Sequence, residues 1–90
     1  MASTVFLPAI LARLTDAKSV EGNGATVGDV VSDLATRYPA LGPRLRDDAG
    51  QPNAFVTIYL NDEDIRFHGG FAAAVADGDE ITVVPAIAGG

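Results

Sequence analysis

Hydrophobic and polar positions alternate near the N-terminus, and this alternation predicts a strand with one buried face. The stretch from Thr4 to Leu11 puts Val5 and Leu7 on one side. Pro8 has no amide hydrogen for a strand ladder, so we expect it at the strand end or at a bulge. A second, shorter strand is expected over Ala17–Glu21.

In that second strand Val20 points inward, and the Gly22-Asn23-Gly24 sequence after it is typical of a turn. The clearest alternation comes later, over Ala54–Leu60, where Val56, Ile58 and Leu60 share one face. This stretch predicts a third strand.

The segment after the third strand contains short elements. Residues 61–64, Asn-Asp-Glu-Asp, predict a turn, and Ile65–Phe67 a short return strand. We expect Phe71–Val75 to be a loop or a single turn, and Asp77-Gly78-Asp79 to be a tight turn. Glu80–Val84 is the expected last strand, with Ile81 and Val83 inward and Pro85 at its end.

One long helix is expected between the second and third strands. Apolar residues recur there at helical spacing, namely Val27, Val30, Val31, Leu34 and Tyr38. Thr26 is a good N-cap, and Asp29 three residues later suits the positive helix start. The helix should end near Tyr38, because the residue before Pro39 is disfavoured in a helix. Leu41–Leu45 predicts one further short turn.

The order strand, strand, helix, strand, short strand, strand predicts an α+β fold. One helix covers one face of a single sheet, and a right-handed crossover then favours a β-grasp, ubiquitin-like roll with a mixed sheet of four to five strands. A ferredoxin-like split βαβ fold needs a second full helix, for which 71–75 is too short. We expect a domain over 1–85 and a flexible tail over 86–90, ending in Gly-Gly.

Composition excludes several classes of function. The chain has 90 residues, which is enough for one domain, and a net charge of -6. An acidic chain is a poor partner for nucleic acid or an anionic membrane surface. There is no cysteine, so thiolate metal sites and cysteine nucleophiles are excluded. No apolar run is long enough to span a membrane and no signal peptide is recognisable, so we expect a cytoplasmic protein.

Catalytic residue types are scarce. His68 is the single histidine, and a triad would need Ser3, Ser19 or Ser32 to reach it. The acidic run 62–64 lacks the spacing of a calcium loop, so we expect a solvated turn and no metal site. A small hydrolase built on His68 and this turn is therefore a weak candidate function.

The C-terminal residues are the most distinctive part of the chain. Ile87, Ala88, Gly89 and Gly90 carry no charged side chain, and the last two carry none at all. Glycine adopts almost any backbone conformation, so this end suits a narrow cleft in a partner. The terminal carboxylate then lies at the tip with nothing beside it.

The chain resembles the small ubiquitin-like sulfur carriers of the MoaD and ThiS group, and looks most like their CysO type. The likeness covers nearly the whole chain and rests on four stretches, namely 7–11, 59–67, 76–80 and 84–90. The Asn-Asp-Glu-Asp turn combined with the Pro-Ala-x-Ala-Gly-Gly end is its most specific part. Ile87 stands where such tails usually carry valine.

The resemblance implies a protein substrate and sulfur carrier rather than an enzyme. An ATP-dependent adenylating enzyme of the ubiquitin-activating type would join AMP to the carboxylate of Gly90, and a sulfur donor would convert it to a thiocarboxylate. Residues 87–89 would enter partner active sites. The carrier itself would bind no cofactor.

The implied acceptor is a pyridoxal-phosphate cysteine synthase, with a zinc peptidase to release the product. Molybdopterin, thiazole or a sulfur-containing secondary metabolite remain alternative destinations of the sulfur. A ubiquitin-like modifier, joined through Gly90 to lysines, is a second function of the same fold.

The strand alternation also places Phe6, Tyr59 and Val84 together on the open face of the sheet. Exposed apolar side chains of this kind favour a docking patch for partners. The competing interpretation is that Phe6 and Tyr59 form a cross-strand pair that only covers the sheet.

Overall fold

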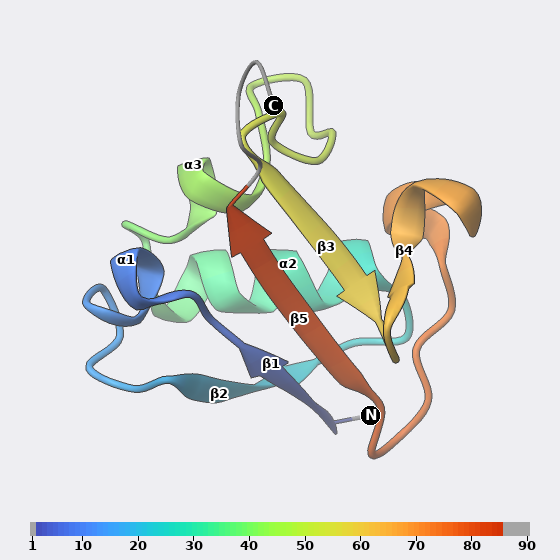
Figure 1. Ribbon diagram of the computed structural model, residues 1–90, viewed down its shortest axis with the longest axis horizontal. Helices are drawn as coiled ribbons and strands as arrows, with labels where there is room; N and C mark the ends of the chain where they lie inside the picture. The colour runs from blue at the N-terminus through green and yellow to red at the C-terminus, as the bar shows by residue number, and fades with distance from the viewer. Residues whose placement is uncertain (1, 86–90) are drawn as a thin grey trace.

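A mixed five-stranded sheet forms the centre of the computed structural model, which describes residues 2–85 (Figure 1). The strands lie in the order β2-β1-β5-β3-β4 and span Ala2–Phe6 (β1), Ser19–Asn23 (β2), Val56–Leu60 (β3), Glu63–Asp64 (β4) and Glu80–Pro85 (β5). β1 pairs with β5 in parallel, whereas the β1–β2, β3–β5 and β3–β4 pairs are antiparallel. The predicted β-grasp roll is confirmed.

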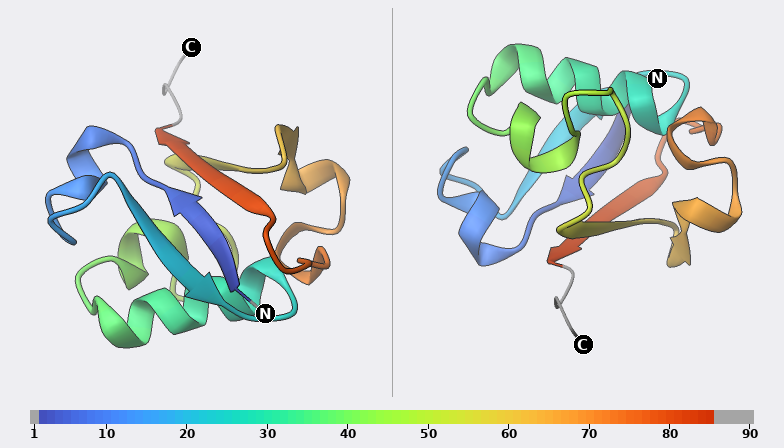
Figure 2. Two further views of the ribbon diagram at one scale, coloured as in Figure 1. Left: turned by 90° about the horizontal axis from the view of Figure 1, so that it is seen from below. Right: turned by 90° about the horizontal axis from the view of Figure 1, so that it is seen from above.

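Helix α2, Val27–Arg37, covers one face of the sheet (Figures 1 and 2). The Thr26 hydroxyl accepts a hydrogen bond from the Asp29 amide at 3.1 Å, as expected of an N-cap. Tyr38 is the C-cap, immediately before Pro39. The predicted helix and both of its ends are therefore confirmed. The predicted short turn after it is α3, Gly42–Leu45.

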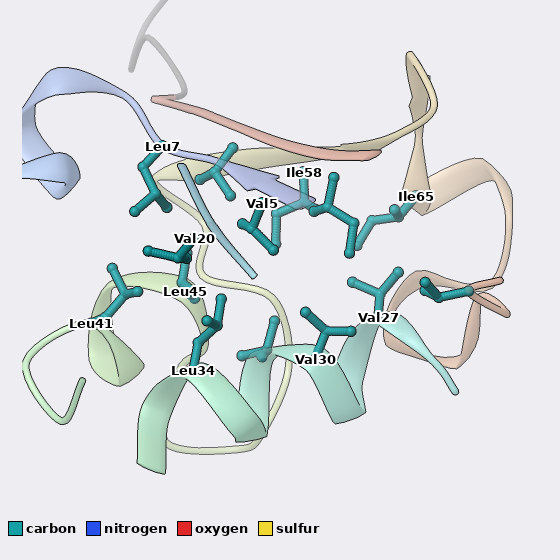
Figure 3. Close-up of a cluster of buried hydrophobic side chains, with 14 of the residues drawn as sticks. Val5, Leu7, Val20, Val27, Val30, Leu34, Leu41, Leu45, Ile58 and Ile65 are labelled. Carbon is teal, nitrogen blue, oxygen red and sulfur yellow. The ribbon is translucent and has the colours of Figure 1, made fainter. Parts of the chain in front are cut away.

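The core lies between α2 and the inner face of the sheet (Figure 3). The inward positions of β1, β3 and β5 supply Val5, Ile58, Ile81 and Val83, all at most 3% exposed. The helix supplies Val27, Val30, Val31 and Leu34, while Leu41, Leu45 and Ile65 close the two ends. Burying these aliphatic side chains is the main source of stability, at about 1.5–3 kcal/mol for each fully buried one.

The predicted strand over 4–11 is wrong in its second half. β1 begins earlier, at Ala2, and ends at Phe6, while Ala9–Ala12 forms the helical turn α1. The carbonyl of Pro8 accepts hydrogen bonds from the Leu11 and Ala12 amides at 2.9 and 2.8 Å. Leu7 and Leu11 are four residues apart, so this turn buries both, and it leaves Ile10 61% exposed.

Strand β2 lies two residues later than predicted. It spans Ser19–Asn23 instead of Ala17–Glu21, and Gly22 and Asn23 pair with β1 instead of forming the expected turn. Val20 is buried as predicted. Gly22 faces α2, where a side chain would collide with the helix, so this glycine serves close packing within the strand and not a turn.

The return strand after β3 also differs from its prediction. The returning residues are Glu63 and Asp64, whereas Ile65–Phe67 forms a 3-10 turn. Asn61 and Asp62 have φ values of 50° and 70°, so two residues are enough to close the hairpin. The expected single turn within 71–75 is Gly70–Ala72, and the turn at Asp77–Asp79 is confirmed, with Gly78 at a φ of 86°.

Candidate functional site

The C-terminal end of β5 is the point from which the predicted tail continues. β5 lies between β1 and β3, and its last residues pair as Val84 with Thr57 and Pro85 with Val56. The segment 86–90 therefore continues from the middle strand of the sheet, at an end where β5 pairs with β3. The predicted site residues Ile87, Ala88, Gly89 and Gly90 lie outside the described residues.

The outer face of the sheet carries the three predicted docking residues. Phe6 is 38% exposed, and Tyr59 and Val84 are half-buried. Their strand neighbours Val5, Ile58 and Val83 point the other way, into the core. The prediction that Phe6, Tyr59 and Val84 share the open face is confirmed.

The strand register does not make Phe6 and Tyr59 a cross-strand pair. Phe6 lies opposite Thr82 on one side of β5, and Tyr59 lies opposite Thr82 on the other. Two strand spacings of about 4.8 Å separate the backbones of Phe6 and Tyr59. Phe6, Tyr59 and Val84 are thus spread over three strands, which suits a broad contact surface better than a local pair.

An apolar groove of about 230 Å³ lies beside the same strand end. Six apolar residues line it, namely Pro8, Ile10, Leu11, Phe55, Val56 and Pro85, together with Arg44 and Asn53. Sequence reasoning missed it because its walls come from four separate segments. The available signals were Ile10 and Phe55, which are large apolar residues that the predicted core does not use.

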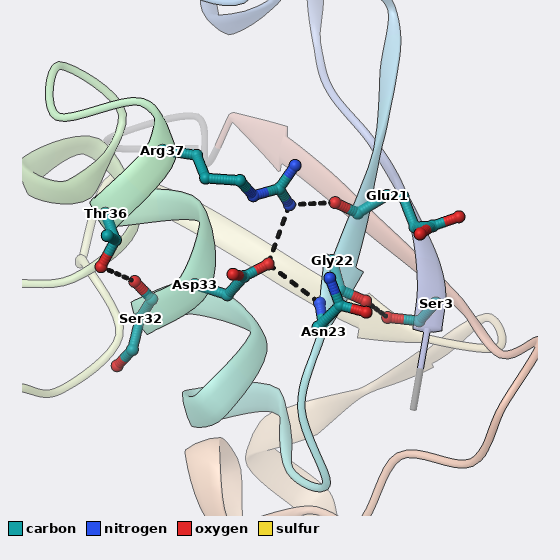
Figure 4. A network of polar contacts seen from close by, with 8 residues as sticks. All are labelled: Ser3, Glu21, Gly22, Asn23, Ser32, Asp33, Thr36 and Arg37. Atoms are coloured by element: carbon teal, nitrogen blue, oxygen red, sulfur yellow. Dashed lines mark hydrogen bonds and ion pairs between the residues drawn. The ribbon is translucent and has the colours of Figure 1, made fainter.

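A polar network ties α2 to β2 away from this end (Figure 4). The Asp33 carboxylate accepts hydrogen bonds from the Asn23 amide at 3.0 Å and from the Arg37 guanidinium at 2.8 Å. Arg37 also donates to the Glu21 carbonyl. The Asn23 amide, and then Arg37, hold the pKa of Asp33 below its ordinary value, so this carboxylate stays ionised and serves the fold.

Two further aspartates stabilise turns. Asp64 accepts hydrogen bonds from the Arg66 side chain and amide, which lower the pKa of Asp64. Asp79 accepts from the Ala76 amide at 2.8 Å, and this bond lowers the pKa of Asp79. Both carboxylates therefore accept hydrogen bonds from residues of their own turns.

The described residues do not assemble the catalytic triad that a hydrolase would need. The Nε2 atom of His68 contacts the Glu63 carboxylate, while the buried Ser3 donates to the Gly22 carbonyl at 3.4 Å. Ser32 accepts from Arg46 at 3.1 Å. Within residues 2–85 no serine hydroxyl bonds to His68, and no cluster of three histidine or carboxylate side chains is placed to hold a metal.

Comparison with known proteins assigns the chain to a protein family. The ThiS family matches residues 5–90, so the chain belongs to this family. The resemblance seen in the sequence is thereby confirmed. Over the part of the chain that the structure describes, none of the helices has the length and apolar character needed to cross a membrane.

Individual relatives give a more specific comparison than the family. The chain is 50% identical to the sulfur carrier protein CysO of Mycobacterium tuberculosis (strain ATCC 25618 / H37Rv), over 97% of both chains. The crystal structure of M. tuberculosis CysO matches with a TM-score of 0.88 and 48% identity, covering 94% of this chain and 99% of that one. The crystal structure of the Amycolatopsis orientalis BexX/CysO complex matches with a TM-score of 0.88 and 44% identity, covering 98% of this chain and 99% of that one.

A more distant relative has a different name. The small archaeal modifier protein 3 of Haloferax volcanii is 39% identical over 66 residues, which are 73% of this chain and 71% of that one.

Proposed function

We propose that this chain is a sulfur carrier protein whose terminal carboxylate, on Gly90, is adenylated and then converted to a thiocarboxylate for biosynthesis, first of all of cysteine. The observation that supports it most is the 50% identity to sulfur carrier protein CysO across 97% of the chain. The pairing of Pro85 with Val56 adds a physical reason, because it fixes the point from which residues 86–90 continue.

The chemistry follows from the properties of a carboxylate. A free α-carboxyl group has a pKa of about 3.5, so it is an anion at neutral pH and resists a sulfur nucleophile. One carboxylate oxygen attacks the α-phosphorus of ATP and releases pyrophosphate, which leaves an acyl adenylate. The sulfur nucleophile then adds to the acyl carbon and expels AMP. The terminus keeps a nucleophilic sulfur in place of one oxygen.

All catalysis in this scheme belongs to partner proteins. An ATP-dependent adenylating enzyme of the ubiquitin-activating type forms the adenylate, so the chain is a substrate and binds no cofactor itself. The reaction takes place in the cytoplasm, where ATP is available. A pyridoxal-phosphate cysteine synthase accepts the sulfur, and a zinc peptidase releases cysteine from the adduct. Molybdopterin, thiazole or a secondary metabolite is the alternative destination. The BexX/CysO complex of Amycolatopsis orientalis supports partner binding in relatives.

The decisive experiment is mass spectrometry of the intact chain after incubation with an adenylating enzyme, ATP and a sulfide donor. We expect oxygen-to-sulfur exchange confined to the terminal residue. A chain that lacks Gly89 and Gly90 is the matched control and should remain unchanged. A full chain that gains no sulfur with any adenylating enzyme of its organism would contradict the proposal.

Protein modification is the second candidate function, and the match to small archaeal modifier protein 3 favours it. The same acyl adenylate would then react with a lysine amine and form an isopeptide bond through Gly90. Isolation of the tagged chain from cells separates the two functions, because a modifier yields branched peptides on other proteins and a carrier yields the thiocarboxylate.

The patch of Phe6, Tyr59 and Val84 is proposed as a contact surface for these partners. Its support is the shared exposure of the three side chains on the face next to the end of β5. Replacing both aromatic residues, Phe6→Ala with Tyr59→Ala, should raise the KM of the adenylating enzyme for the carrier about tenfold. The circular dichroism spectrum should not change. Unchanged kinetics in a folded double variant would remove this role.

A further inference from the structure

The apolar groove lies on the side of the sheet opposite the patch of Phe6, Tyr59 and Val84. Val56 and Pro85 are paired across the β3–β5 ladder, and both alternate with outward-facing residues, so they face the same side as Ile58 and Val83. At this end of the sheet the side is flanked by α1 and α3 (Figures 1 and 2). The groove therefore borders the residue from which the tail continues.

The walls of the groove are held in place by hydrogen bonds. The Asn53 side chain donates to the Pro43 carbonyl at 2.8 Å and accepts from the Phe55 amide at 2.7 Å. The Asn53 amide donates to the Leu45 carbonyl at 3.0 Å. Asn53 thus joins the segment before β3 to α3 and fixes the Phe55 wall, so the groove is formed before any partner arrives.

The two most prominent walls of the groove are apolar side chains in contact with water. Phe55 is 70% and Ile10 is 61% exposed. Phe67, at 81%, is more exposed still, but it lies beyond β4, at the opposite edge of the sheet. Large exposed apolar groups gathered around a concave surface indicate a contact site for another protein.

The charge at the groove specifies the kind of partner. Arg44 is the one charged residue in its lining, on a chain with a net charge of -6. Among residues 2–85, Arg44 takes part in none of the ion pairs. A guanidinium beside an apolar surface suits a segment that carries an apolar side chain next to a carboxylate.

We propose that the groove is a docking site for the adenylating enzyme, and that it takes an enzyme segment with one apolar side chain beside an aspartate or glutamate. This inference rests on the proposed function, because the enzyme has to hold residues 86–90 in its active site. Five extended residues reach about 17 Å, so an enzyme surface that surrounds the tail also covers the groove at Pro85. The carrier is then held on both faces of the sheet at the start of its tail.

The test is ATP–pyrophosphate exchange at varied carrier concentration, with the ubiquitin-activating-type enzyme of the source organism that gives exchange with the unmodified carrier. The groove variants are Ile10→Ser with Phe55→Ser, and Arg44→Glu. We expect each to raise the KM for the carrier about tenfold or more with kcat unchanged, and Arg44→Lys to raise it less than Arg44→Glu. Phe67→Ser, which removes a still more exposed ring at the far edge of the sheet, should leave both constants unchanged.

Every other result overturns the inference. An unchanged KM in both groove variants, or an equal rise in KM caused by Phe67→Ser, would show that the enzyme does not bind in the groove. A lower KM in the variants would mean that residues 86–90 of the same chain occupy it and compete with the enzyme. If the unmodified carrier sediments as a dimer and Arg44→Glu abolishes that dimer, the groove binds a second copy of the chain instead. If no such enzyme gives exchange with the unmodified carrier, the proposed function fails, and the inference fails with it.

Discussion

At Gly22 the absence of a side chain lets α2 approach β2 closely. A Cβ atom at this position would lie 2.5 Å from Val30 Cγ1 and 3.3 Å from Val5 Cγ2. Both neighbours are buried and β-branched, so neither turns away easily. The close packing of α2 on β2 at this point therefore requires glycine at position 22.

The first prediction concerns this position. Gly22→Ala should lower the free energy of unfolding by about 1–3 kcal/mol, because an overpacked core displaces the helix or strains its side chains. Urea unfolding at neutral pH measures the change. Glu21→Ala, on the exposed side of the same strand, is the control and should stay within about 0.5 kcal/mol. Equal stability of the two variants would contradict the steric argument.

The sequence shows that Gly22 is special but not why. Next to Asn23 and Gly24 it has the composition of a turn, and local chemistry favours that interpretation. Its actual role is set by Val30, eight residues later on another element. A close approach of this kind is a property of the packed pair, so one strand's sequence does not reveal it.

Among the elements, α2 was predictable because several local signals agree. Thr26 supplies the cap, the apolar spacing supplies the buried face, and Pro39 supplies the end. The short turns α1 and Ile65–Phe67 carry no such agreement. In each of them three or four residues fit a strand as well as a turn, and tertiary contacts at Leu11 and Ile65 decide between the two.

The second prediction tests the helix cap. Thr26→Ala removes the acceptor for the Asp29 amide and should lower the free energy of unfolding by about 1 kcal/mol. Thr26→Ser keeps the hydroxyl and should recover most of the loss. Thermal unfolding of the three proteins measures the difference. If serine destabilises as much as alanine, the cap bond is not the cause.

Across the whole molecule, stability should depend on pH through three aspartates. Asp33, Asp64 and Asp79 have pKa values lowered in the fold by their hydrogen bonds. Their contribution is therefore complete above the ordinary aspartate pKa of about 3.9, and it is lost as the pH falls through the lowered values. Urea midpoints should be nearly constant between about pH 7 and 5 and fall below about pH 4.

A matched pair of triple variants isolates this effect from the general charge of the chain. Asparagine at Asp33, Asp64 and Asp79 should reduce stability at neutral pH and flatten the acid slope. Asparagine at three exposed aspartates, Asp16, Asp48 and Asp62, changes the net charge equally, but among the described residues their side chains accept no hydrogen bond. If the second variant flattens the slope as much, general repulsion is responsible.

For the molecule as a whole, the fold could be predicted from the order of the helix and strands, whereas the apolar groove could not. One helix between two pairs of strands leaves few arrangements, so the β-grasp roll followed from the sequence. Alternation placed Phe6, Tyr59 and Val84 on one face correctly. The groove joins residue 8 to residue 85 through Arg44 and Phe55, and no local pattern connects positions so far apart.

The parallel pairing of β1 with β5 has a consequence for protein synthesis. β5 is the middle strand of the sheet, yet it comes after the other four strands in the chain, so β1 and β2 have no strand to pair with on their open side until β5 has been synthesised. A product that ends before β5 lacks the centre of its sheet and is open to degradation. The sheet becomes compact only when β5 has been synthesised, so its folding depends on the strand that comes after the other four.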